Sequence, residues 1–138
     1  MKPFKELTRR ARLHRLREVA EAALDVYGIR DAELTFLQYH ENVIYRVDRA
    51  GSHARAAHSP FLLNRYVLRI HAEGDADTVA SELVWLAALD REARLPVPAP
   101  LTTPEGDLVA TVTTPNIPNG RVVSLLRWLD GRKIHKGL

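Results

Sequence analysis

Apolar positions recur with two different periods along this chain of 138 residues, and the two periods predict its helices and strands. Spacings of three and four predict an amphipathic helix over residues 5–27 and a second helix over residues 75–91. Gly28 follows the first helix and is predicted to end it, because glycine adopts the left-handed backbone of a helix C-terminus at low cost. The apolar positions of the two helices are Leu13, Leu16, Ala20, Ala23, Leu24 and Tyr27, and then Val79, Leu83, Leu86 and Leu89.

Five shorter segments have the composition or the alternation of β-strands, and residues 43–49 show it best, with Val43, Tyr45 and Val47 on one face. Loops and turns rich in proline, glycine or polar residues separate the strands, among them residues 49–64 and 115–120. The prolines of residues 96–100 predict an extended backbone. The five predicted strands are 32–38, 43–49, 65–71, 108–113 and 122–129.

The order of these elements is helix, three strands, helix, two strands. It predicts an α+β fold in which a mostly antiparallel sheet of about five strands packs against a helix, with an extra helix at the N-terminus. We expect one domain over residues 1–138. Within it, residues 1–28 form a basic helix, residues 29–130 form the sheet with its helix, and residues 131–138 begin a linker.

Composition agrees with a globular fold, since 46% of the residues are hydrophobic and 27% are charged. The chain has no cysteine, which excludes disulfides, thiolate metal sites and cysteine nucleophiles. The scattered histidines do not form a metal-binding motif, and we predict no metal site. No apolar run approaches the roughly 18 residues that cross a bilayer. We expect a cytoplasmic protein that does not bind membranes.

Positive charge is concentrated at the N-terminus. Residues 1–17 contain seven Lys and Arg residues against Glu6, a net charge of +6, whereas the whole chain carries +3, so residues 18–138 carry −3. An Arg-rich helix is able to bind nucleic acid or an acidic partner. No aromatic residues interleave with these arginines, so we favour a solvated helix face and do not expect nucleic acid as the partner.

One basic and one acidic residue stand out by their positions. Arg69 lies in the predicted strand 65–71, and Glu82 lies in the helix that follows it. A cation on a strand and a carboxylate on the next helix are the arrangement that holds a phosphate-binding side chain in kinases. The alternative is an ordinary ion pair that braces a helix on a sheet.

Five segments, in this order and spacing, resemble the small lobe of the aminoglycoside phosphotransferase/choline kinase family. The resemblance covers about residues 15–138. The segments are residues 41–47 (ENVIYRV), 66–71 (YVLRIH), 81–89 (SELVWLAAL), 95–100 (LPVPAP) and 125–132 (LLRWLDGR).

The resemblance implies that the chain binds ATP. The turn formed by Tyr39, His40, Glu41 and Asn42 is expected to lie over the phosphates. Arg69 falls where the family has its phosphate-binding lysine, and Glu82 where the helix glutamate pairs with that lysine. Val47 and Val67 are expected to form an apolar roof over adenine. The hinge that hydrogen-bonds the adenine edge is expected to comprise Leu126, Arg127, Trp128 and Leu129.

The chain departs from the family pattern in two ways. Arginine replaces lysine at position 69, and its planar guanidinium binds phosphate differently from an ammonium. The family's catalytic base and magnesium ligands belong to a large lobe, and the chain stops at Leu138 before such motifs. We therefore expect no catalytic residues here, and Mg²⁺ only in an intact two-lobe relative. The chain alone is expected to be inactive, and its partner is expected to be the large lobe, another chain or a second copy.

Two other functions are compatible with the sequence. A separate small lobe exposes the apolar surface that faces the large lobe, which suits a protein-interaction module or a self-associating lobe. A nucleic-acid-binding domain acting through the Arg-rich helix is the third possibility, and its binding would weaken steeply with salt.

Overall fold

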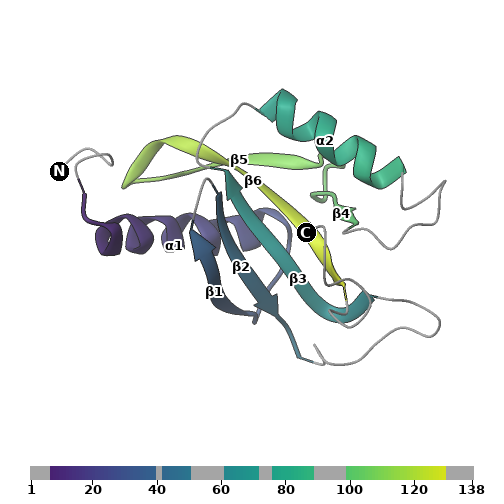
Figure 1. Cartoon of the computed structure of the whole chain (residues 1–138), viewed down its shortest axis with the longest axis horizontal. Helices are drawn as coiled ribbons and strands as arrows, with labels where there is room; N and C mark the ends of the chain where they lie inside the picture. The colour runs from purple at the N-terminus through teal and green to yellow at the C-terminus, as the bar shows by residue number, and fades with distance from the viewer. Residues whose placement is uncertain (1–6, 40–41, 51–60, 72–75, 89–98, 130–138) are drawn as a thin grey trace.

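A computed structural model describes residues 7–39, 42–50, 61–71, 76–88 and 99–129 of the chain. Two helices and six strands follow one another within these residues (Figure 1). Their bounds are α1 (Arg9–Val26), β1 (Glu33–Tyr39), β2 (Asn42–Asp48), β3 (Phe61–His71), α2 (Ala76–Ala88), β4 (Pro100–Leu101), β5 (Val109–Thr114) and β6 (Ile117–Leu129).

Helix α1 confirms the first predicted helix, but it begins at Arg9 and not at residue 5. The Thr8 side chain accepts a hydrogen bond from the Ala11 amide at 3.2 Å and caps the first turn. The helix ends at Val26 with Tyr27 as its cap, and Gly28 follows, whose φ of 74° lets the Ile29 amide reach the Leu24 carbonyl at 2.8 Å. The buried face of the helix consists of Leu16, Val19, Ala20, Ala23 and Leu24. The periodicity of three and four therefore identified the core face correctly.

The sheet is antiparallel throughout the described residues, in the order β1-β2-β3-β6-β4, with β5 also paired to β6. Five long strands confirm the predicted α+β architecture. The two-residue strand β4 is an addition, in which Pro100 and Leu101 pair with Leu126 and Leu125. The extended backbone that proline imposes thus continues into pairing at the edge of the sheet.

Two predicted boundaries were wrong. Strand β3 begins at Phe61, so it includes the last residues of the predicted loop 49–64. Strand β6 begins at Ile117, inside the predicted turn 115–120. The hairpin closes through the Ile117 amide, which donates to the Thr114 hydroxyl at 3.1 Å. Gly120 of β6 has a φ of 79° and lies beside the register shift in β5. This irregularity in the pairing allows β6 to continue through the glycine.

The two helices cover different faces of the sheet, and β5 and β6 pass between them in the view of Figure 1. Alternate strand residues such as Val47, Leu68 and Leu125 belong to the larger core cluster, with α1. The residues beside them in sequence face the other way, and Leu126 packs against Val79 and Leu83 of α2. We call these the α1 face and the α2 face of the sheet. Neither described helix is long and apolar enough to cross a membrane.

Candidate functional site

The α2 face of strands β2, β3 and β6 gathers the polar and charged side chains that the core excludes. In the antiparallel register, Arg69 of β3 lies between Ile44 of β2 and Ser124 of β6. Val67, two residues earlier, lies between Arg46 and Leu126. Because directly opposed residues project to the same side of a sheet, these side chains form one surface.

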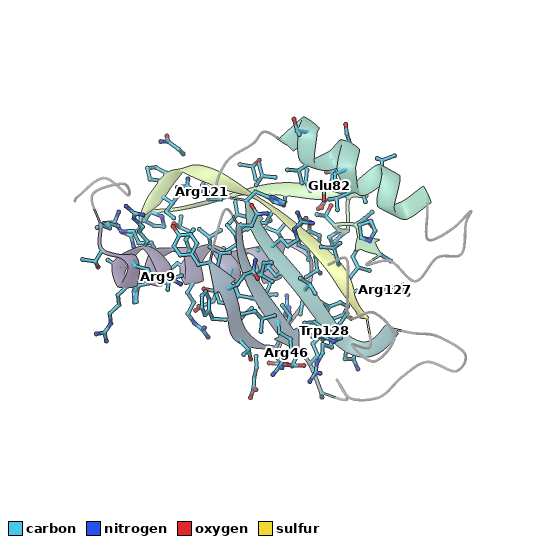
Figure 2. All side chains as sticks on the ribbon, viewed as in Figure 1. Arg9, Arg46, Glu82, Arg121, Arg127 and Trp128 are labelled. Atoms are coloured by element: carbon cyan, nitrogen blue, oxygen red, sulfur yellow. The ribbon has the colours of Figure 1, made fainter. Side chains whose placement is uncertain are left out.

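Arg69 and Glu82 meet as the sequence predicts. The Arg69 Nη1 lies 3.4 Å from the Glu82 Oε1, and the two side chains are 20% and 51% exposed. Helix α2 brings Glu82 there because its neighbour Leu83 is fully buried against the sheet, and Figure 2 shows Glu82 on the side of α2 that faces the strands. A pair this open to water contributes little stability, so its position on the surface is more informative than its strength.

A second polar pair lies beside Arg69, and no motif in the sequence predicts it. The His71 Nε2 lies 3.0 Å from the Ser124 Oγ, and both residues are buried. Burial and, to a smaller extent, the nearby positive charge of Arg69 lower the pKa of His71 to about 4, against the opposing effect of Glu82. The imidazole is therefore neutral at physiological pH. The register between β3 and β6 is what brings these two residues together.

Val47 does not belong to the candidate site. It was expected to cover adenine together with Val67, but its side chain is fully buried in the α1-facing core. The prediction chose a residue of the wrong parity, since side chains alternate between the faces of a strand. Ile44, three residues earlier on β2, lies on the α2 face beside Arg69 and diagonal to Val67. Ile44 and Val67 are thus apolar neighbours on β2 and β3 on the face that carries Arg69.

The predicted hinge residues differ in what they offer. Leu126 is buried, at 2% exposure, under Val79 and Leu83. The Arg127 amide already donates to the Ala99 carbonyl at 2.8 Å, so it is not a free donor for a base. Trp128 is half-buried, and the Arg65 guanidinium lies 5.7 Å from the centre of its ring. Leu129 is the last residue of β6.

An ion-pair cluster occupies the end of the α2 face away from Glu82, where Figure 2 shows Arg46 and Trp128. The Asp48 carboxylate accepts from the Arg46 Nε at 2.7 Å and from the Arg65 Nε at 2.5 Å. Burial alone would raise the pKa of Asp48, but the hydrogen bonds and charges of both arginines outweigh it and lower this pKa below its usual value. The cluster fixes Arg65 over Trp128.

The predicted phosphate loop is described only at its two ends, because His40 and Glu41 lie outside the described residues. Tyr39 pairs with Val43 and therefore faces the α1 side, where the Arg9 guanidinium lies 5.4 Å from the centre of its ring. Asn42 pairs with His71, on the α2 side. The structure thus brings Asn42, but not the Tyr39 side chain, to the face of Arg69.

Two other features lie away from this face. An open cavity of about 610 Å³ lies where α1 turns into β1, lined by Asp25, Gly28, Arg30 and Asp31 among others. On α1, Arg17 lies 3.5 Å from Glu21. No group of three or more metal-binding side chains comes together within the described part of the chain.

Comparison with known proteins bears on the fold. No protein-family model matches the chain, and no curated protein matches it. A solved structure described as that of a microcompartment-associated aminopropanol kinase superposes with a TM-score of 0.65 at 28% identity. The alignment covers 83% of this chain and 32% of the kinase. The chain has the fold of a kinase-like small lobe.

This kinase-like small lobe therefore spans about a third of the length of the protein it resembles, given the 32% coverage. The likeness agrees with the expected architecture and with a kinase-like phosphotransferase fold. The strand residue Arg69 and the helix residue Glu82 lie together on one face of that fold, 3.4 Å apart.

Proposed function

We propose that the chain is the nucleotide-binding lobe of a small-molecule kinase, of the aminoglycoside phosphotransferase/choline kinase type. The observation that carries the proposal is the Arg69–Glu82 pair on the α2 face, 3.4 Å apart, in a chain whose fold is that of a kinase small lobe. Glutamate holds the cation in place, and the cation neutralises phosphate charge. The ligand is ATP, and Mg²⁺ accompanies it only in an intact two-lobe protein.

The α2 face supplies the rest of the nucleotide site. Ile44 and Val67 cover the base, Asn42 adjoins the phosphates, and Trp128 and Leu129 follow at the hinge. Arg69 contacts the α- and β-phosphates with a guanidinium, which is able to bind two oxygens at once. The lobe contributes positioning and charge neutralisation, and a second lobe, from a longer protein or a partner chain, contributes the chemistry.

Calorimetric titration of ATP into the purified chain tests this function. Arg69→Ala is expected to weaken ATP binding about 10- to 100-fold, because a hydrogen bond to a charged group contributes about 1.5–3 kcal/mol. Glu82→Gln is expected to weaken it less, since the cation remains but loses its anchor. Arg30→Ala, at an exposed site near the end of α1, is the control. ATP binding that is absent, or unaffected by Arg69→Ala, contradicts the proposal.

The salt dependence of binding distinguishes the nucleic-acid alternative from ATP binding. Binding through the Arg-rich helix is expected to fall with a slope of about −0.9 per phosphate contacted on a log–log plot, and to be lost in Arg9→Ala/Arg10→Ala. Some of these arginines have partners within the chain, as Arg9 has in Tyr39 and Arg17 in Glu21, which supports the proposal of ATP over nucleic acid.

A further inference from the structure

The buried His71–Ser124 pair has no role in the proposed contacts with ATP, yet it lies next to the residue on which they depend. Ser124 is directly opposite Arg69 in the β3–β6 register, and His71 is two residues from Arg69 on the same face. Opposed side chains have Cβ atoms about 4.5–5.5 Å apart. Arg69 therefore rises from the sheet with Ser124 beside it and His71 next to it along the strand.

We propose that His71 and Ser124 are positioning residues that direct the Arg69 guanidinium toward Glu82 and hold it ready for a phosphate. The inference rests on the proposed function as far as the phosphate is concerned. Neither residue touches the nucleotide in this proposal, and both act through Arg69.

The hydrogen bond between the two residues explains how they direct Arg69. Ser124 is directly opposite Arg69 in the β3–β6 ladder, and its hydroxyl is hydrogen-bonded to the His71 ring at 3.0 Å. This hydrogen bond holds the His71 ring and the Ser124 side chain in one orientation beside the base of Arg69, and so restricts the rotamers that the Arg69 side chain can adopt. Among these rotamers is the one in which the Arg69 Nη1 lies 3.4 Å from the Glu82 Oε1.

Burial makes the arrangement rigid. Ser124 is fully buried and His71 is 5% exposed, so water does not replace a broken hydrogen bond between them at low cost. His71 must also be neutral, because an imidazolium beside Arg69 would repel the guanidinium. Among the described residues, the charged or polar groups near His71 include Arg69 on β3, Glu82 on α2 and Ser124 on β6. Asn42 of β2 is its partner in the ladder.

Two measurements test the inference on the same set of variants. The first is the rotation rate of the Arg69 guanidinium about its Nε–Cζ bond, by NMR without nucleotide, with Arg69→Lys assigning the signal. The second is the ratio of ATP affinity to adenosine affinity by calorimetry, which isolates the contribution of the phosphates. The variants are Ser124→Ala and His71→Leu. Their controls are Ser81→Ala and His14→Leu, which make the same substitutions at exposed positions.

Ser124→Ala and His71→Leu are expected to speed the rotation several-fold and to lower the ATP-to-adenosine ratio about 3- to 10-fold, the effect of one hydrogen bond. The controls are expected to change neither. A defect limited to folding would weaken ATP and adenosine equally. If either variant fails to fold, Ser124→Cys and His71→Gln, which keep the volume and a polar atom, replace it and are expected to show smaller changes.

The outcomes separate the two proposals. A folded Ser124→Ala protein with an unchanged rotation rate overturns the positioning role, whatever ATP does. If the unmodified chain does not bind ATP, the proposed function fails, and the rotation rate alone decides whether His71 and Ser124 order Arg69. A faster rotation with an unchanged ATP-to-adenosine ratio overturns the link to phosphate binding.

Discussion

The two faces of the same three strands have opposite characters. On the α1 face, β2, β3 and β6 contribute Val47, Leu68 and Leu125, all at 2% exposure or less, to the larger core cluster. On the α2 face, the neighbouring residues form a small apolar cluster around Leu83, flanked by charges and by a buried hydrogen-bonded pair. One face is built for stability, and the other retains groups that fit a binding role at the expense of apolar burial.

The largest expected difference between the faces concerns the adjacent residues Leu68 and Val67. Leu68→Ala is expected to lower the free energy of unfolding by about 3 kcal/mol, because it opens a cavity in a fully packed core. Val67→Ala is expected to cost about 1 kcal/mol, since Val67 is only half-buried. Urea unfolding measures both, with exposed Val84→Ala as the control. Equal costs at positions 67 and 68 would contradict the contrast between the faces.

The pH dependence of stability tests the α2 face through the buried His71. The unfolded chain takes up a proton on this histidine near pH 6.5, whereas the folded chain does so only near pH 4. Stability is therefore expected to be full above pH 6.5, to fall as the pH drops from 6.5 to 4, and to lose on the order of 3 kcal/mol in that window.

Unfolding at a series of pH values measures this loss, and His71→Leu supplies the comparison. The variant is expected to be less stable at pH 7 and nearly flat between pH 6.5 and 4, because it has no proton to take up at this position. A slope in the variant as steep as that of the unmodified chain would assign the acid sensitivity to other groups.

A smaller effect is expected at Tyr27, which makes a buried polar contact on the α1 side. Its hydroxyl donates to the Leu108 carbonyl at 3.1 Å, and the Val123 carbonyl lies at 3.5 Å. Burial raises the pKa of Tyr27 to about 12. Tyr27→Phe is expected to cost about 1 kcal/mol by urea unfolding, one buried hydrogen bond. A loss of more than twice this size would mean that the hydroxyl holds α1 in place to a greater extent than two carbonyl contacts explain.

The smallest effect on stability is expected where the effect on binding is largest. Arg69→Ala should change the free energy of unfolding by about 0–1 kcal/mol, since its ion pair with Glu82 is open to water. Thermal and urea unfolding measure this change alongside the ATP titration. A cost of several kcal/mol would assign Arg69 to bracing α2 on the sheet, which is the structural alternative for this pair.

Much of the fold was predictable because it depends on local patterns. The spacing of Leu16, Ala20 and Ala23 identified the buried face of α1, and Gly28 marked its end. The boundaries of β3 and β6 were missed because strand limits depend on the pairing partner. Phe61 extends β3 opposite Leu129, a residue far away in sequence. Propensity rules do not contain that partner, and the prolines and glycine of residues 115–120 favoured a longer turn.

The candidate site was predictable in part for the same reason. Arg69 lies near the end of β3 and Glu82 lies in the next helix. Their meeting therefore followed from the order of the elements and from the resemblance. Val47 was misplaced because side chains alternate along β2, and the register that puts Ile44 opposite Arg69 depends on pairing with β3. His71 and Ser124 are 53 residues apart, so only the β3–β6 pairing brings them together.

Residue type and short-range spacing were therefore enough to predict the α+β architecture, the core face of α1 and the two residues of the Arg69–Glu82 pair. The tertiary structure decided which alternate residues of a strand face α1 and which face α2. As a result Ile44, and not Val47, lies on the face of Arg69. His71 is buried beside Ser124, and the Arg127 amide donates to the Ala99 carbonyl. The physical reason is that register between distant strands fixes which side chains share a face, and a period of two along one strand does not specify the partner.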